Sequence, residues 1–197
     1  MRNVKTVTSA FYFTVFLFGI ISVAHAEKMQ TTGSLSAGTL ALGLEFQAGL
    51  ITGTPLELGL HEMVGLKGGF DLYARQGIQL RDDRTVYLGA GIKWTILTSN
   101  RQRPGVALLA GGHYWIDHWA GADGTIIFDY PIGRVTPLVG LDAKLDLPDS
   151  GAELRMGLLA IIRISVVTNI SWFIEGEIGI TGEPKSTFIS TGPKITI

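Results

Sequence analysis

A strict two-residue alternation in residues 40–50 places the strongest constraint on the fold of this chain. The segment reads LALGLEFQAGL, so every even position is apolar and every odd position is small or polar. Because successive side chains of a β-strand point to opposite faces, one face is wholly apolar while the other carries glycine, a carboxylate and an amide. The same pattern recurs along most of the chain, which predicts an all-β fold.

The first 26 residues have the features of a cleaved export signal. Arg2 and Lys5 give a basic start, residues 11–23 are an apolar run, and the small-x-small motif AHA ends at residue 26. A membrane-spanning helix needs ~20 apolar residues, which this run does not reach. We therefore expect a signal peptide at residues 1–26 and export across the inner membrane.

The rest of the chain has room for one domain with a core of its own. Residues 27–38 are rich in Thr, Ser and Gly without periodicity, which predicts a flexible N-terminal tail before a single β domain at residues 39–197. The chain has no cysteine, which excludes a disulfide scaffold, a thiolate nucleophile and a sulfur-ligated metal. No basic block indicates nucleic-acid binding.

Turn signals rich in Gly, Pro, Asp and Asn divide this domain into ten predicted strands. The expected ranges are 40–50, 56–60, 64–75, 85–96, 105–117, 125–132, 134–147, 153–166, 170–180 and 187–197. Short connections between neighbouring strands predict a single antiparallel up-and-down barrel of ten strands. If the short segments 56–60 and 125–132 do not span, the count falls to eight.

The apolar face of these strands is expected to meet lipid. In the predicted register that face carries no Asp, Glu, Lys or Arg, although such residues make up 17% of the chain. Most strands reach the ~9–11 residues of a tilted membrane crossing. Glycines such as Gly43, Gly89, Gly91 and Gly111 lie on the polar face, where a narrow lumen would need small residues. The alternative is a soluble exported barrel whose apolar face is its core and binds lipid.

Aromatic residues on the apolar face agree with a membrane barrel, because such barrels carry aromatic girdles at both membrane interfaces. The predicted outward aromatics are Phe46, Phe70, Trp94, Tyr114, Phe128, Tyr130 and Trp172.

With this pattern the chain resembles the small outer-membrane barrels of Gram-negative bacteria, of the OmpA transmembrane-domain and OmpX kind. The resemblance covers residues 40–197 and concerns architecture rather than a motif. It implies an outer-membrane location and two partners, the outer-membrane lipid and the assembly machinery of that membrane. Members of the family usually end in an aromatic residue, whereas this chain ends in Ile197.

Charged residues on the polar face are expected to fill the lumen as a structural network. The predicted set is Glu45, Lys67, Asp71, Arg75, Lys93, Arg134, Asp142, Lys144, Arg155, Arg163, Glu175, Glu177 and Lys194, with Glu57, Asp117, Asp129, Asp146 and Glu153 on the same face. Buried charges are costly unless they pair, so acids and bases in near balance predict a salt-bridged, largely closed lumen. The expected function is a non-enzymatic envelope or structural role. The alternative is a porin-like channel for small solutes.

Enzymatic alternatives depend on loop residues. The pairs Asp82-Asp83 and Asp117-His118 resemble acidic and Asp-His elements of the omptin proteases, and a loop-sited hydrolase is therefore a further alternative. His113 lies on the predicted inner face near Asp117, but no adjacent loop offers a serine nucleophile. No spacing of His and Asp indicates a metal site. We therefore expect no catalytic residue, no metal and no cofactor.

Overall fold

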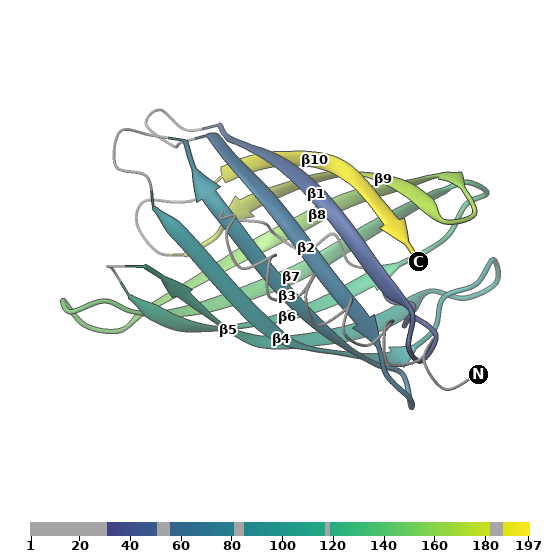
Figure 1. Cartoon of the computed structure of the whole chain (residues 1–197), viewed down its shortest axis with the longest axis horizontal. Coiled ribbons are helices and arrows are strands. Elements are labelled where there is room, and N and C mark those ends of the chain that lie inside the picture. Colours follow the sequence, from purple (N-terminus) through teal and green to yellow (C-terminus); the bar gives the residue numbers. More distant parts are fainter. Residues whose placement is uncertain (1–30, 51–55, 81–84, 117–118, 182–186) are drawn as a thin grey trace, which may run out of the picture.

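The computed structural model describes residues 31–50, 56–80, 85–116, 119–181 and 187–197, and these form one closed barrel. Its strands are β1 (Leu40–Gly49), β2 (Leu56–Gly65), β3 (Phe70–Gln79), β4 (Val86–Leu97), β5 (Gly105–Trp115), β6 (Ala120–Asp129), β7 (Val135–Leu147), β8 (Glu153–Val167), β9 (Ile170–Gly179) and β10 (Thr187–Thr196). Each strand pairs antiparallel with its neighbour in sequence (Figure 1). The prediction of a ten-stranded up-and-down barrel is confirmed, and the eight-stranded alternative is wrong.

Pairing between the first and last strands closes the barrel. Ala41 on β1 lies opposite Thr196 on β10, and the backbone N–H of Ile197 donates to the carbonyl of Leu40 at 2.7 Å. Because every strand then has two neighbours, the sheet has no free edge whose N–H and C=O groups would meet hydrocarbon. Within the described ranges, no helix is long and apolar enough to cross a membrane.

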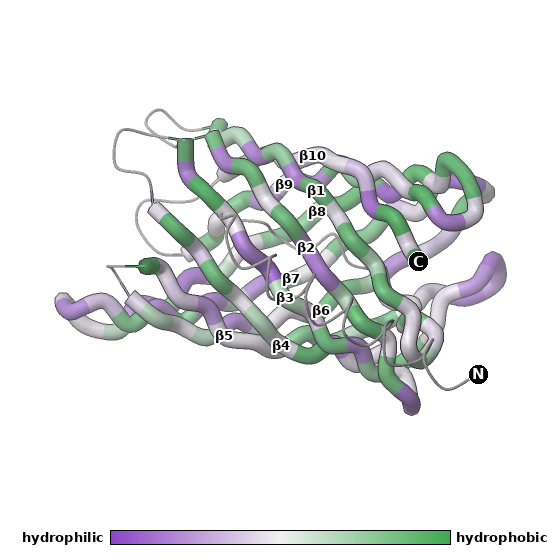
Figure 2. Tube along the Cα trace, viewed as in Figure 1, coloured by the Kyte–Doolittle hydropathy of each residue, from purple (hydrophilic) through white to green (hydrophobic). Residues whose placement is uncertain are grey.

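Side chains alternate between the two faces as the sequence predicts. Along the strands, hydrophilic and hydrophobic residues follow one another in turn (Figure 2). On β1, Leu44 exposes 48% of its surface to the outside while its neighbour Glu45 exposes none. The same contrast recurs on β8, where Ile162 is exposed and Ile161 is buried. The outer face is therefore an apolar band around the whole barrel.

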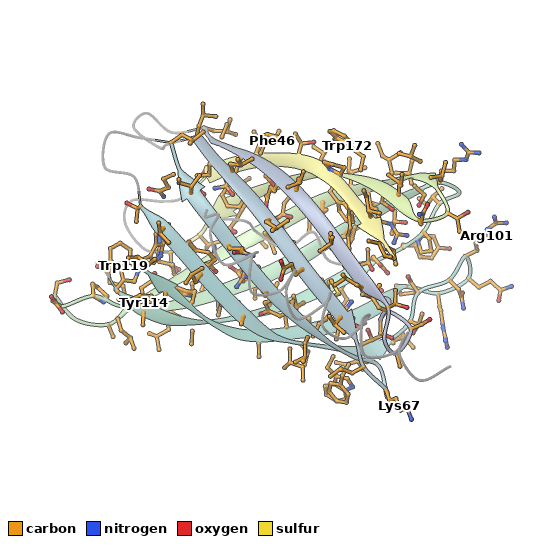
Figure 3. The ribbon with its side chains drawn as sticks, viewed as in Figure 1. Phe46, Lys67, Arg101, Tyr114, Trp119 and Trp172 are labelled. Carbon is orange, nitrogen blue, oxygen red and sulfur yellow. The ribbon has the colours of Figure 1, made fainter. Side chains whose placement is uncertain are left out.

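The predicted outward aromatics are all exposed on this band. Phe46 and Trp172 point away from the barrel in Figure 3. Phe70 and Trp94 stack with ring centroids 6.0 Å apart, close to the turn that joins β2 and β3. Most of these aromatics lie near the end of the barrel where β10 finishes, which is the girdle expected at one membrane interface.

The barrel end that carries the C-terminus has short turns, and we call it the turn end. Gly68 and Gly69 both have positive φ, at 76° and 81°, in the tight connection of β2 to β3. Lys67 and Arg101 project from this end in Figure 3. All four Lys and Arg residues of the turns at 66–69, 98–104 and 130–134 are exposed, and these turns contain no Asp or Glu.

Three predicted strands have clearly different bounds in the structure. The strand predicted at 64–75 is β3, which begins six residues later, at Phe70, and continues to Gln79. β2 continues through residues 61–65, where a turn was expected, so Glu62 lies on the outer face opposite Ala74. The prediction of an outer face without any charge is wrong at this residue. β6 begins and ends earlier than predicted, which brings Asp123 into the lumen and leaves Tyr130 in the following turn.

Candidate functional site

The N-terminal plug, which we define as residues 31–36, lies in the lumen at the turn end. Thr32 is fully buried there. Its backbone N–H donates to Asp129 Oδ2 at 3.2 Å, and its hydroxyl donates to Asp129 Oδ1 at 2.6 Å. The hydroxyl of Thr95 donates to the Thr32 carbonyl at 2.6 Å. One threonine is thus held by β6 and by β4.

An ion pair on β3 and β4 holds the same segment. Lys93 Nζ lies 2.7 Å from Asp71 Oδ2. The ammonium also donates to the carbonyl oxygens of Thr31 and Gly33, at 3.1 and 2.7 Å. Asp71 Oδ1 accepts the backbone N–H of Leu35 at 2.9 Å. Both charges predicted at these positions therefore bind the backbone of the plug as well as each other.

Glycines in the wall make room for the plug. A Cβ atom at Gly105 would overlap the Thr32 hydroxyl and would lie 2.6 Å from Asp129 Oδ1. A Cβ atom at Gly65 would lie 2.7 Å from Leu35 Cβ. The predicted crowding at inward glycines is confirmed at these positions. The sequence indicated only a tail at residues 27–38, because the segment has no periodicity that would reveal these contacts.

A second group of charges, the central network, follows the wall from β3 to β8. Arg75 Nη2 donates to Asp123 Oδ2 at 2.8 Å. His113 lies between two carboxylates, with Nδ1 3.5 Å from Asp123 Oδ1 and Nε2 2.7 Å from Asp146 Oδ1. The guanidinium of Arg155 donates to Asp146 Oδ2, from Nε at 2.7 Å and also from Nη2. Positive and negative groups alternate along this chain of contacts.

Aromatic rings pack against the central network. The Arg75 guanidinium lies 5.3 Å from the Tyr73 ring centroid and 5.6 Å from that of Tyr87. The Tyr87 ring stacks on His113 at 5.7 Å. Gly111 lies beneath Tyr73, where a Cβ atom would come within 2.5 Å of the phenol oxygen. The rings and the ion pairs together fix the rotamers of these side chains.

Smaller polar groups line the remaining wall. His61 Nε2 lies 2.8 Å from Glu45 Oε2 on the neighbouring strand. Lys144 Nζ lies 3.4 Å from Asp142 Oδ2 and 3.7 Å from Glu177 Oε2. The remaining contacts include a hydrogen bond from Arg163 to Thr136, a cation-π contact of Lys194 with Phe173, and hydrogen bonds from Gln47 and Gln79 to Glu57.

Each ion pair named above joins strands that are no more than three apart around the barrel. Arg75 and Asp123 join β3 to β6, which is the longest step among the pairs described above. In a barrel of ten strands, opposite walls are five strands apart. The plug therefore obstructs the turn end, whereas the central network lines the wall between β3 and β8, which is half of the circumference of the barrel.

Most residues predicted for the lumen network face the lumen in the structure. Three predictions on this face are wrong. Lys67 and Arg134 lie in exposed turns beyond the ends of the strands, and Glu153 is exposed at the start of β8. Asp117, Asp82, Asp83 and His118, on which the hydrolase alternative depended, lie outside the described residues.

Sequence reasoning missed Asp123, His61 and the outward pair of Glu62 and Gln76. Asp123 lies among small residues in AGADG, where no apolar alternation marks a strand. Glu62 interrupts an apolar series, and this interruption predicts a turn at the residue. Among the described residues, no group of three or more His, Asp or Glu side chains is arranged to hold a metal ion.

No protein-family model matches this chain, and no curated protein does. Similar solved structures include the N-terminal β-barrel domain of Pseudomonas aeruginosa OprF, at 6% identity and a TM-score of 0.43, covering 83% of this chain and 100% of that one. The KdgM porin shows 10% identity and a TM-score of 0.48, covering 79% and 98%. A de novo designed transmembrane β-barrel shows 11% identity and a TM-score of 0.39, covering 83% and 99%. Identities this low say nothing about the role of this chain.

Proposed function

We propose that this chain is a non-enzymatic outer-membrane β-barrel protein whose lumen is largely closed and which has a structural role in the envelope. The observation that carries the proposal is the outer surface, where aliphatic and aromatic side chains are exposed on every strand. A soluble protein rarely exposes a contiguous apolar patch above a few hundred Å². A band that surrounds the whole barrel is instead the surface of a protein dissolved in lipid.

The lumen supports the closed form of the proposal. The lumen is occupied at the turn end by the plug, which is bound by Asp71, Lys93, Thr95 and Asp129. Displacing the plug would leave the carboxylates of Asp71 and Asp129 without the hydrogen bonds that the plug donates. Each charge-assisted hydrogen bond of this kind contributes roughly 1.5–3 kcal/mol. The plug is therefore a stable part of the barrel rather than a loose end.

The proposed outer-membrane location is tested by membrane fractionation of cells that express the full chain. We expect the protein in the outer-membrane fraction, with faster gel migration in unheated samples than in boiled ones. Recovery from the soluble periplasm without detergent would contradict the proposal and would favour the soluble lipid-binding barrel.

Conductance in planar bilayers tests whether the lumen is closed. We expect little steady conductance for the mature chain. A second function, a small-solute channel gated by the plug, is favoured by one observation: each ion pair named above joins strands no more than three apart, fewer than the five that separate opposite walls. Deletion of residues 27–38 separates the two functions. A barrel whose lumen is closed by the side chains of its wall should still show little conductance after the deletion, whereas a channel closed only by the plug should become conductive.

A further inference from the structure

A polar pair on the outer face interrupts the apolar band. Gln76 Nε2 donates to Glu62 Oε1 at 3.3 Å, and both side chains point outward from adjacent strands β2 and β3. Glu62 exposes only 8% of its surface and Gln76 only 6%. Leu58, Leu60 and Val64 flank Glu62 along its strand, so the carboxyl group lies within the band and away from its edges. Among outward side chains on the described strands, Glu62 is the only acid or base.

A carboxyl group at this depth is costly unless it has a partner. Charged side chains on the lipid face of a barrel destabilise it by an amount that depends on depth, and intramembrane acidic residues usually pair with another polar group. The single hydrogen bond from Gln76 occupies Oε1. In the part of the chain that the structure describes, Oε2 of Glu62 accepts no hydrogen bond, and neither does the amide oxygen of Gln76. The pair therefore has two oxygen atoms that can accept a hydrogen bond from a ligand.

The polar pair and five other outward residues line an open groove with a volume of about 560 Å³, and its lining also includes four residues at lumen-facing positions of the same wall, Arg75, Gly89, His113 and Gly121. Small residues from three neighbouring strands form its floor in one paired row, in which Ala74 lies opposite Ala90 and Ala90 opposite Gly112. Leu88 and Tyr114 stand beside this row. The groove runs across the strands and begins at the carboxyl group of Glu62. We call it the outer groove.

The geometry points to a binding site for a single acyl chain that carries a hydrogen-bond donor part-way along its length. The groove volume lies within the ~300–1,000 Å³ range of small-ligand sites and is too small to seat another barrel or helix. Its apolar floor fits methylene groups. The free acceptors of Glu62 and Gln76 fit a hydroxyl group or an amide N–H at mid-chain depth. This inference is independent of whether the lumen conducts.

Two matched probes test the site on the mature chain purified in detergent. The probes are 12-hydroxystearate and stearate, which have the same chain and differ by one hydroxyl group. Native mass spectrometry counts the copies of each that remain bound. One hydrogen bond in a dry site is worth about tenfold in affinity, so we expect the hydroxylated chain to be retained about tenfold better. Equal retention of the two probes, or of neither, would overturn the inference.

Three variants connect this preference to the groove. Glu62→Leu should abolish the preference for the hydroxylated chain. Ala90→Leu fills the floor and should reduce retention of both probes, whereas Ala160→Leu, exposed on β8 outside the groove, should change neither. If Glu62→Leu does not fold, the comparison of Ala90→Leu with Ala160→Leu still shows whether the probes bind in the outer groove. Unchanged retention of the probes by Ala90→Leu would contradict the inference. It would also be contradicted if the protein formed a dimer without any probe and Ala90→Leu dissociated that dimer, because the groove would then be a contact between two copies of the chain.

Discussion

Arg75 on β3 and Asp123 on β6 form an ion pair across two intervening strands, with Arg75 Nη2 2.8 Å from Asp123 Oδ2 and both side chains 1% exposed. This contact fixes the distance between two parts of the wall that share no backbone hydrogen bonds. The cost of removing one partner exceeds the net stability that the pair confers, because the remaining charge stays buried.

Asp123→Ala should therefore lower the free energy of unfolding by roughly 3–5 kcal/mol. Urea titration in lipid vesicles measures this change. Asp149→Ala, at an exposed turn position, is the control and should stay within about 0.5 kcal/mol of the wild type. The double variant Arg75→Met, Asp123→Leu should be more stable than Asp123→Ala alone. A mild effect of Asp123→Ala would show that water reaches Arg75.

A change of charge on the outer face of β1 should lower the free energy of unfolding more than a change of charge on its inner face. Leu44→Arg places a cation on the lipid face and should cost about 2–4 kcal/mol near the midplane, as should Ile162→Arg on β8. Glu45→Gln keeps a hydrogen-bonding group beside His61 and should cost less. Equilibrium folding into bilayers ranks these variants, with Leu44→Ile as the size control. The reverse order would mean that the assigned faces are wrong.

Filling the space beneath the plug should expel it. Gly105→Val places methyl groups where the Thr32 hydroxyl lies, whereas a Cβ atom at Gly124 would have no neighbour closer than 3.8 Å. Since the chain has no cysteine, Leu35→Cys gives a single thiol whose reaction with a maleimide reports whether the plug is in place. We expect faster labelling with Gly105→Val and unchanged labelling with Gly124→Ala. Equal labelling rates in the two variants would contradict the contact between the Thr32 hydroxyl and the wall at Gly105.

The basic turn end should favour anionic membranes. Lys67, Arg101, Arg103 and Arg134 are all exposed there without neighbouring acids in the same turns. A cation near an anionic surface contributes about 1 kcal/mol, and at 1 M salt the screening length falls to about 3 Å. The barrel should thus be more stable in anionic than in zwitterionic vesicles at low salt only. Replacing all four residues by alanine should remove the difference, and a difference that survives high salt would have another cause.

Alternation predicted the barrel well because most strands carry an unbroken apolar face. It failed where that face is interrupted or weak. Glu62 looked like the end of a strand because a charged residue is not expected on a lipid face, and the small residues around Asp123 showed no pattern at all. Most of the lumen charges were predicted from the two-residue alternation alone, that is, from whether a residue falls on the inner or the outer face of its strand. The partners of these charges were not predicted, because the alternation gives the face on which a residue lies but not which other strand its side chain reaches.

The contact of Thr32 with Asp129 joins residues 97 positions apart in the sequence. It requires β6 to be in place, whereas the contacts of Lys93 and Asp71 with the plug require only β3 and β4. Long-range contacts form late because the intervening chain must first be ordered. The plug thus gains its full set of contacts only after β6, and with it more than half of the wall, is in place. An arrested assembly intermediate would differ from the finished barrel in having an N-terminal segment that a protease can cleave.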